Sequence, residues 1–272
     1  MIPAAFDYTV AESAEHAIQL LGEYGDESKL LAGGHSLIPM MKYRLATPTQ
    51  LIDVGRLNDL SYINRSNGHI AIGAMTKHKQ LETSDVLAEA CPMLAHVASL
   101  VGDPSVRHRG TLGGTMAHAD SASDLPAAVL ALGGTIVAQG PNGQREIAAT
   151  DFFKSYFESA LEPDEMIVEI RVPADTGGWN YQKFNRRAQD WAIVGVAVAD
   201  GGKGIALVNM GSTPLRASAS EAALASGASA ADAAAMAADG TEPPEDLNAD
   251  GAYRTHLAKV LTQRALEAAN GE

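Results

Sequence analysis

Residues 30–44 have the sequence LLAGGHSLIPMMKYR, in which an apolar run ends at two adjacent glycines, Gly33 and Gly34. Paired glycines permit positive φ angles and let a ligand approach the backbone closely. Successive N–H groups in such a turn bind phosphate oxygens, and a helix that begins near Leu37 adds its N-terminal dipole. The stretch alone is equally compatible with a phosphate-binding turn and with a structural turn in which Ser36 caps the helix.

The segments around these glycines predict a βαβ-like unit, because two short apolar runs flank a helical pattern. The first strand, the helix and the second strand are expected at residues 29–32, 37–45 and 50–54. The glycines therefore lie at the carboxyl end of the first strand.

A nucleophilic serine is a third possibility for Ser36. A nucleophile elbow requires Gly-x-Ser-x-Gly, because its tight turn leaves no room for side chains at either glycine. The fifth position here is Ile38, so the hydrolase interpretation is disfavoured. The stretch is also neither a Gly-x-Gly-x-x-Gly dinucleotide fingerprint nor a Walker A loop.

A second glycine pair occurs in Thr111-Leu112-Gly113-Gly114-Thr115. Two such turns would suit the diphosphate of an extended dinucleotide. The pair lies within VRHRGTLGGTMAHADSASDLP, residues 106–126, a polar stretch between apolar helical segments that predicts a long functional loop. Its acidic and hydroxyl residues could bind ribityl or ribose hydroxyls: Asp120, Ser121, Ser123 and Asp124.

Several residues of this stretch keep two interpretations. Asp124 could instead cap a helix that begins at Pro126. The basic cluster at residues 107–109 is equally compatible with ligand binding and with a solvated or salt-bridged surface. His118 is more typical of a satisfied loop histidine than of a catalyst.

The composition excludes several classes of function. The chain has 272 residues and a formal net charge of −13, which argues against a nucleic-acid or anionic-membrane surface. The one cysteine, Cys91, cannot form an internal disulfide, a structural zinc site or an iron–sulfur cluster, and is interpreted as a buried packing thiol. No signal peptide or membrane-spanning run is evident, so a soluble cytoplasmic protein is expected.

Beyond the glycine stretches, the patterning predicts a mixed helix and strand chain. Helices are expected at 13–24, 79–89, 93–101, 127–132 and 253–270, and further strands at 69–73, 135–138, 144–147 and 166–172. A boundary is expected at 176–178, followed by three antiparallel strands at 179–185, 192–200 and 204–210.

Five ordered blocks of the chain resemble one family. The stretches AGGHSLIPMMKYR and TLGGTMAHADSASDLPAAVLALGG are similar to the two flavin motifs of the FAD-binding medium subunits of molybdenum hydroxylases. IPAAFDYTVAESAEHAIQLL, LIDVGRLNDLSYI with IAIGAMTKHKQLE, and YQKFNRRAQDWAIVGVAVA with AYRTHLAKVLTQRAL are similar to its start, middle and C-terminal domain. Within this family, the amino-acid sequence of these stretches is most similar to the carbon monoxide dehydrogenase branch.

The resemblance implies an α+β fold of the vanillyl-alcohol-oxidase (PCMH) type. Two α/β subdomains would clamp FAD, and a C-terminal domain of three antiparallel strands and helices would follow. The expected divisions are residues 1–56, 57–176 and 177–272.

The resemblance also assigns cofactor-binding residues by position. The FAD diphosphate would contact Ala32, Gly33, Gly34, His35, Ser36, Thr111, Gly113, Gly114 and Thr115. Asp124 would contact the flavin side, Thr76 lies in the family's GAxT block, and Trp191 would present an aromatic ring to the isoalloxazine or pack in the core. Ile167 and Lys183 match further FAD-contacting positions. Thr115 departs from the family pattern, because xanthine dehydrogenases usually carry Asn there.

The implied function is electron relay with no catalytic side chain and no metal on this chain. Carbon monoxide would be oxidised at a molybdenum–copper centre on a large partner subunit. Electrons would pass through two [2Fe–2S] clusters on a small partner subunit to FAD here, and then to quinone or another acceptor. A dimer of heterotrimers is expected, in the cytoplasm or at the inner membrane face through its partners.

Three alternatives accompany this interpretation. The chain could be the medium subunit of a molybdenum hydroxylase for N-heterocycles, aldehydes or aromatic acyl-CoA. It could be a stand-alone FAD oxidoreductase, although it lacks the length for a substrate lid. It could also be a flavin-free assembly subunit, although both glycine motifs are intact.

Overall fold

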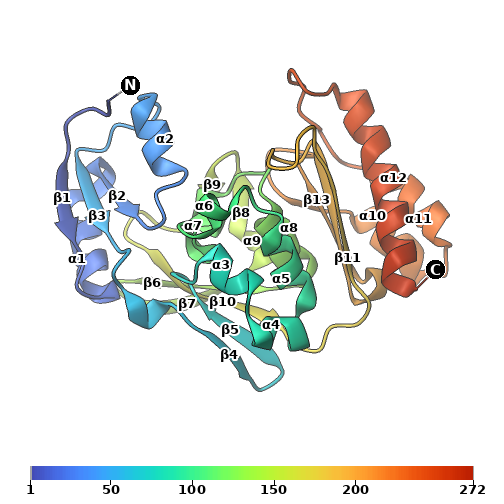
Figure 1. The fold of residues 1–272 in the computed structure, drawn as a ribbon, viewed down its shortest axis with the longest axis horizontal. Helices are drawn as coiled ribbons and strands as arrows, with labels where there is room; N and C mark the ends of the chain where they lie inside the picture. Colours follow the sequence, from blue (N-terminus) through green and yellow to red (C-terminus); the bar gives the residue numbers. More distant parts are fainter. Residues whose placement is uncertain (1, 272) are drawn as a thin grey trace.

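The computed structural model of the protein describes residues 2–271. Figure 1 shows three parts in a row, each built on its own sheet: an N-terminal part, a central part whose helices lie above a sheet, and a C-terminal part with the long helix α12 on its outer side. The glycine motifs therefore belong to two different parts of the molecule, the first to the N-terminal part and the second to the helices of the central part.

The N-terminal part is a three-stranded parallel sheet of order β1-β3-β2. Its strands are β1 (Asp7–Val10), β2 (Ser28–Leu31) and β3 (Gln50–Asp53). Helix α1 (Ala14–Tyr24) and a 3-10 turn η1 (Gly25–Glu27) join β1 to β2, and helix α2 (Leu37–Lys42) joins β2 to β3. The expected β2-α2-β3 unit is confirmed, with Gly33 and Gly34 directly after β2.

The sequence explains the start of α1. The side chain of Ser13 accepts a hydrogen bond from the backbone N–H of His16, which satisfies one free donor of the first turn. The helix then buries one apolar stripe that includes Ala17, Ile18 and Leu21 against the sheet.

The central part is a five-stranded antiparallel sheet of order β4-β5-β10-β6-β7. Its strands are β4 (Ile63–Ser66), β5 (His69–Gly73), β6 (Thr135–Gly140), β7 (Gly143–Ala148) and β10 (Met166–Pro173). A 3-10 turn η2 (Asn58–Leu60) precedes it, and a small hairpin of β8 (Phe153–Ser155) and β9 (Glu158–Ser159) lies beside it.

Short helices above the central sheet hold the second glycine motif (Figure 1). They are α3 (His78–Glu82), α4 (Asp85–Ala90), α5 (Pro92–Ser99), α6 (Pro104–Arg107), α7 (Leu112–His118), α8 (Asp124–Ala131) and α9 (Ala149–Phe152). Together with the sheet they enclose the largest apolar core, in which Cys91 is fully buried as expected.

The C-terminal part is an antiparallel sheet of order β11-β12-β13-β14. The three expected strands are β11 (Asn180–Phe184), β12 (Val194–Ala199) and β13 (Gly204–Val208), and β14 (Leu215–Arg216) adds a fourth, two-residue strand. A 3-10 turn η3 (Asp200–Gly202) joins β12 to β13, and helices α10 (Ser218–Ala225), α11 (Ala230–Ala235) and α12 (Gly251–Asn270) follow. The predicted apolar face of α12 is buried through Leu257, Leu261 and Leu266.

Two local predictions are wrong. The single helix expected at 79–89 is two helices, α3 and α4, because the Ser84 side chain caps a new helix by accepting from the Leu87 N–H. The long loop expected at 106–126 is largely helical, and Gly113 and Gly114 lie inside α7. Strands β1 and β4 and the β8–β9 hairpin were not expected.

Candidate functional site

The two glycine motifs are packed against each other. A Cβ atom built on Gly33 would lie 2.4 Å from the backbone oxygen of Arg109 and 2.9 Å from the Cα of Gly110. A Cβ built on Gly114 would lie 3.8 Å from the Cβ of Ala32. The turn after β2 and the segment that leads into α7 therefore form one composite site, although they are almost 80 residues apart in sequence.

The first motif presents a row of free backbone donors. The N–H groups of residues 33–37 donate to no acceptor among the described residues. The neighbouring Ile38 N–H donates to the Gly34 oxygen at 3.1 Å, and Gly34 has a φ of +74°, which favours glycine. Consecutive free donors around a positive φ angle are the geometry that an anion-binding turn requires.

Ser36 does not cap the helix that follows it. Its side chain makes no hydrogen bond to the first turn of α2, so the expectation of a helix cap is wrong. The hydroxyl is exposed, and His35 lies beside it with its ring Nδ1 3.1 Å from the Gly33 oxygen. No hydrogen bond links Ser36 to a histidine among residues 2–271, so the structure contains no activated serine here.

The second motif is not a second donor turn. The N–H groups of Leu112 and Gly113 donate to the Thr76 and Ala74 oxygens at 2.9 and 2.8 Å. The Gly114 N–H donates to the Thr111 side-chain oxygen at 3.2 Å, which makes Thr111 the N-cap of α7. These glycines serve close packing instead, since a Cβ on Gly113 would lie 2.6 Å from the Ala74 Cβ.

Thr76 and Thr115 complete this part of the site in different ways. Thr76 is fully buried, and its hydroxyl donates to the Tyr62 oxygen at 3.0 Å and accepts from the Tyr62 N–H at 3.2 Å. These bonds join the segment after β5 to the residue before β4. Thr115 is half-buried and its hydroxyl makes no hydrogen bond within the described chain, so it remains able to bind a ligand.

His78 lies directly behind the second motif and was not predicted. It is 4% exposed, and burial lowers its pKa to about 4, with His35 and Arg107 acting in the same direction. Its Nδ1 is buried without a partner among the described residues. A Cβ on Gly110 would lie 2.7 Å from its Nε2, so the neutral imidazole requires a glycine at position 110.

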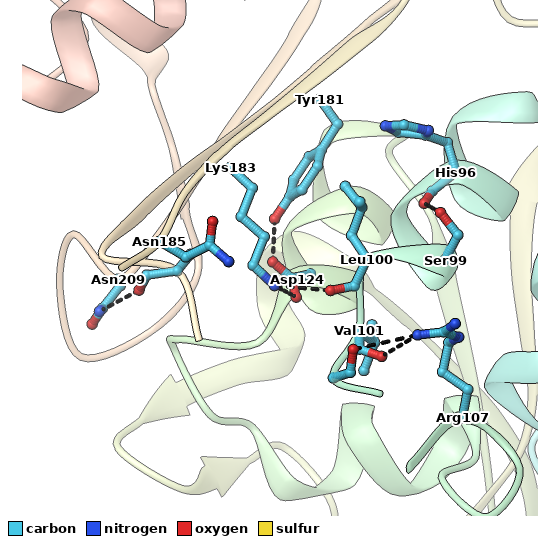
Figure 2. A network of polar contacts seen from close by, with 12 residues as sticks. His96, Ser99, Leu100, Val101, Arg107, Asp124, Tyr181, Lys183, Asn185 and Asn209 are labelled. Atoms are coloured by element: carbon cyan, nitrogen blue, oxygen red, sulfur yellow. Dashed lines mark hydrogen bonds and ion pairs between the residues drawn. The ribbon is translucent and has the colours of Figure 1, made fainter. Parts of the chain in front are cut away.

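Asp124 and Lys183 form a buried ion pair between the central and C-terminal parts. The Lys183 Nζ is 2.8 Å from the Asp124 Oδ2, and both side chains are 7% exposed. Figure 2 shows the lysine reaching from β11 to the start of α8, where it also donates to the Leu100 oxygen at 3.0 Å. The Tyr181 hydroxyl donates to the other carboxylate oxygen, Oδ1, at 2.6 Å.

The environment of this ion pair is strongly desolvated. Burial raises the pKa of Asp124, while the charge of Lys183 and the hydrogen bonds from Lys183 and Tyr181 oppose that rise. Burial also raises the pKa of Tyr181 well above its usual range. The Asp124 side chain makes no cap hydrogen bond, because the helix already begins at Asp124 and the carboxylate faces Lys183 and Tyr181. The alternative role of Asp124 as a helix cap is therefore wrong.

Trp191 and Ile167 differ most in exposure among the predicted residues. Trp191 is 65% exposed, at the end of the loop between β11 and β12, so the alternative of core packing is wrong. Ile167 is 5% exposed on β10 and belongs to the central core. The loop that carries Trp191 is held to the central part through Asn209, whose side chain donates to the Ala192 oxygen and whose N–H donates to the Ser121 oxygen.

The basic cluster divides into one structural residue and two exposed ones. Arg107 donates to Glu82 at 2.9 Å and to the Val101 oxygen at 3.1 Å, so it supports the end of α5. His108 and Arg109 are exposed. His118 is half-buried and stacks against Phe157 with ring centroids 5.0 Å apart.

Other surfaces of the chain offer less chemistry. Two hollows lie along the central sheet. One of about 290 Å³ is lined by residues that include Gly68 and His69, and one of about 260 Å³ by residues that include Tyr62 and Glu169. Neither is lined by a residue of the glycine motifs. Within residues 2–271 no group of three or more His, Cys, Asp or Glu side chains could hold a metal ion. Over the same residues, no helix has the length and hydrophobicity needed to cross a membrane.

Two family models match nearly the whole chain. The FAD binding domain in molybdopterin dehydrogenase matches residues 4–175, and the CO dehydrogenase flavoprotein C-terminal domain matches residues 179–269.

Known proteins match over the full length as well. The carbon monoxide dehydrogenase medium chain of Hydrogenophaga pseudoflava is 42% identical over 99% of this chain and 98% of its own. The 6-hydroxypseudooxynicotine dehydrogenase complex subunit alpha of Paenarthrobacter nicotinovorans is 37% identical over 98% of this chain and 95% of its own. The solved carbon monoxide dehydrogenase from H. pseudoflava that lacks the Mo-pyranopterin moiety superimposes with a TM-score of 0.94 at 44% identity, covering 100% of this chain and 99% of that chain. The expected α+β fold is confirmed.

Proposed function

The chain belongs to the family of FAD-binding medium subunits of molybdenum hydroxylases, and from this premise we propose that it is the electron-transfer subunit of an aerobic carbon monoxide dehydrogenase. Electrons would enter from [2Fe–2S] clusters on a small partner subunit and leave to an external acceptor such as quinone. Carbon monoxide would be oxidised on a large partner subunit that holds the molybdenum cofactor and copper. A dimer of heterotrimers, associated with the membrane face only through its partners, completes the proposal.

The residues present fit FAD at the composite glycine site. The free N–H groups of residues 33–37 can donate to diphosphate oxygens, and the exposed Ser36 hydroxyl can add a further donor. Ala32, His35 and Gly34 shape the same turn, with the positive φ of Gly34 aiming successive N–H groups to one side. Any side chain larger than hydrogen at Gly33 would separate the two motifs.

The second motif is proposed to form the opposite wall of the diphosphate site. Thr115 supplies a free hydroxyl, while Thr111 and Gly114 hold the first turn of α7 against Ala32. Gly113 and Thr76 contribute by packing, because both are buried and their polar groups are already paired within the chain. The first motif would therefore supply most of the hydrogen-bond donors, and the second would contribute mainly packing.

The ion pair and the exposed tryptophan are proposed to serve the flavin end. The Lys183 ammonium, held by Asp124, places a fixed positive charge where the central and C-terminal parts meet. We propose that the exposed ring of Trp191 faces the isoalloxazine and that the buried Ile167 packs behind it. We further propose that residues 1–56, 57–176 and 177–272 act as two FAD-binding subdomains and a C-terminal domain.

The chain's own contribution to the reaction is binding and electrostatics. FAD, when bound, supplies the ability to accept and pass on electrons. Oriented N–H groups hold the diphosphate without moving, and a buried ammonium favours the negative charge that a flavin gains on reduction. No side chain is assigned proton abstraction, because no substrate carbon reacts on this subunit.

The observation that carries the proposal is the row of free N–H donors at residues 33–37, packed against the second motif. The test is anaerobic addition of carbon monoxide to the complex of this chain with its partner subunits, recorded in the visible flavin band. Bleaching that requires the iron–sulfur partner is expected. Bleaching of the isolated chain by carbon monoxide, or no bleaching in the complex, would contradict the relay.

A second candidate function is that of a molybdenum hydroxylase whose substrate is not carbon monoxide. The 37% identical relative carries the name of a 6-hydroxypseudooxynicotine dehydrogenase subunit, and the proposed FAD site would serve either function. Bleaching of the complex by an N-heterocycle or aldehyde, with no response to carbon monoxide, would favour this second candidate.

A further inference from the structure

Tyr181 belongs to a network of three buried groups, in which Asp124 lies far in sequence from Tyr181 and Lys183. Its hydroxyl donates to the Asp124 Oδ1 at 2.6 Å across 57 residues, and the Asp124 Oδ2 accepts from the Lys183 ammonium at 2.8 Å. Tyr181 and Lys183 stand two residues apart on β11, so both side chains project from the same face of the strand. Figure 2 shows the two side chains descending from β11 onto one carboxylate.

The fold reserves space for the tyrosine hydroxyl. Gly195 lies inside the fully buried central strand β12, where a glycine weakens the strand unless something approaches its backbone closely. A Cβ built on Gly195 would lie 2.9 Å from the Tyr181 hydroxyl oxygen. The side chain of Val208 would lie 3.0 Å from the same Cβ, so the glycine leaves room for both the Tyr181 hydroxyl and Val208.

The chemistry of the network gives the hydroxyl a specific task. Hydrogen bonds to both oxygens favour the ionised form of a buried carboxylate, and here one donor is the phenol and the other is the ammonium. Lys183 has three N–H groups, of which one donates to Asp124 and one to the Leu100 oxygen. The third donates to no other described residue, and the two fixed bonds determine where it points.

We propose that Tyr181 is a positioning residue for the cofactor: it fixes the Asp124 carboxylate, which in turn fixes the direction of the Lys183 ammonium toward the flavin. This inference rests on the proposed function, since it assumes that FAD lies at the junction of the central and C-terminal parts. It adds a residue that neither glycine motif contains.

The test is Tyr181→Phe in the full-length chain, which removes the hydroxyl and keeps the ring. The matched control is Tyr62→Phe, because the Tyr62 hydroxyl also donates to a carboxylate, that of Glu169, at 2.7 Å. Tyr62 contacts the candidate residue Thr76 through its backbone N–H and carbonyl, which the substitution keeps. Four quantities are measured: the Kd for FAD by flavin fluorescence, the reduction potential of bound flavin, its visible circular dichroism, and the melting temperature of the chain.

The expected result is about a tenfold weaker Kd for FAD in Tyr181→Phe, the free-energy equivalent of one buried hydrogen bond. The reduction potential falls and the circular dichroism changes, because a displaced ammonium stabilises the reduced cofactor less. Tyr62→Phe leaves all flavin properties at their wild-type values. Gly195→Ala is expected to reproduce the effect, and combining it with Tyr181→Phe adds little further loss.

Two other outcomes are separable. A Tyr181→Phe chain with a lower melting temperature but wild-type FAD affinity, potential and circular dichroism would assign the tyrosine a purely structural role and overturn the inference. If Tyr181→Phe does not fold, Gly195→Ala decides by the same criteria. A wild-type chain that binds no FAD, alone or with partners, would instead overturn the proposed function.

Discussion

The α-carbon of Gly33 faces the backbone carbonyl of Arg109 so closely that a Cβ atom would lie 2.4 Å from its oxygen. This contact joins the turn after β2 to the segment that leads into α7. The contact packs the two glycine motifs together. It also explains why position 33 accepts no side chain.

Gly33→Ala is accordingly expected to abolish stoichiometric FAD binding and to lower the melting temperature. The added methyl group cannot avoid the Arg109 carbonyl, because both partners are backbone atoms. Gly22→Ala is the matched control: a Cβ there meets nothing within 4 Å, and alanine is the better helix former by about 1 kcal/mol. Flavin content after gel filtration is the measurement, and full FAD occupancy in Gly33→Ala would refute the packed-motif site.

Lys183→Met is expected to destabilise the chain by about 3–5 kcal/mol, because it leaves the buried Asp124 carboxylate without its cation. Lys203→Met is the control, since Lys203 pairs with Asp200 at the same 2.8 Å distance but with its side chain 80% exposed. The control is expected to change stability by less than about 1 kcal/mol. Chemical denaturation followed by circular dichroism measures both, and equal effects would show that the Asp124 pair is not desolvated.

The stability of the flavin-free chain is expected to fall as the pH decreases from 6.5 toward 4 because of His78. Its pKa is about 4 in the folded protein and 6.5 when unperturbed, so the unfolded chain takes up a proton first. The stabilisation is complete above pH 6.5 and reduced by up to roughly 3 kcal/mol once the pH is below 4.

Denaturation midpoints across this pH range measure the effect of His78. His78→Leu removes the titrating group and is expected to flatten the profile, whereas replacement of the exposed His256 by Gln leaves it unchanged. A wild-type profile that keeps its slope in His78→Leu would assign the acid sensitivity to other groups.

Trp191 is expected to be quenched by bound FAD, because its exposed ring can approach the isoalloxazine. The chain has two tryptophans, and the other, Trp179, is half-buried and stacks on His96 at 5.5 Å. Titration with FAD should therefore quench tryptophan emission strongly in Trp179→Phe and weakly in Trp191→Phe. The reverse pattern would place the flavin away from the loop between β11 and β12.

Local patterns predicted the elements well where one short segment decides the outcome. The turn at Gly33–Gly34 follows from its glycines, and Ser13 caps α1 as its position suggested. The helix expected at 253–270 is α12, which buries Leu257 and Leu261.

The sequence was less informative where a hydrogen-bond donor has several possible acceptors. Thr111 takes the Gly114 N–H, which converts an apparent loop into the helix α7 and removes donors from the second motif. The Tyr181 hydroxyl donates to Asp124, which is 57 residues away in sequence, and no local pattern specifies this contact. A glycine inside a strand of valine and alanine, Gly195, was a signal that a side chain approaches the backbone there.

The central claim is that the composite glycine site binds the diphosphate of FAD. Its most direct test is to purify the full-length chain, alone and with its partner subunits, and to identify and count the flavin released by acid. We expect one FAD per chain and no FMN, because we propose that the free donors at residues 33–37 bind a dinucleotide diphosphate. The absence of flavin from both preparations, or FMN in place of FAD, would contradict it.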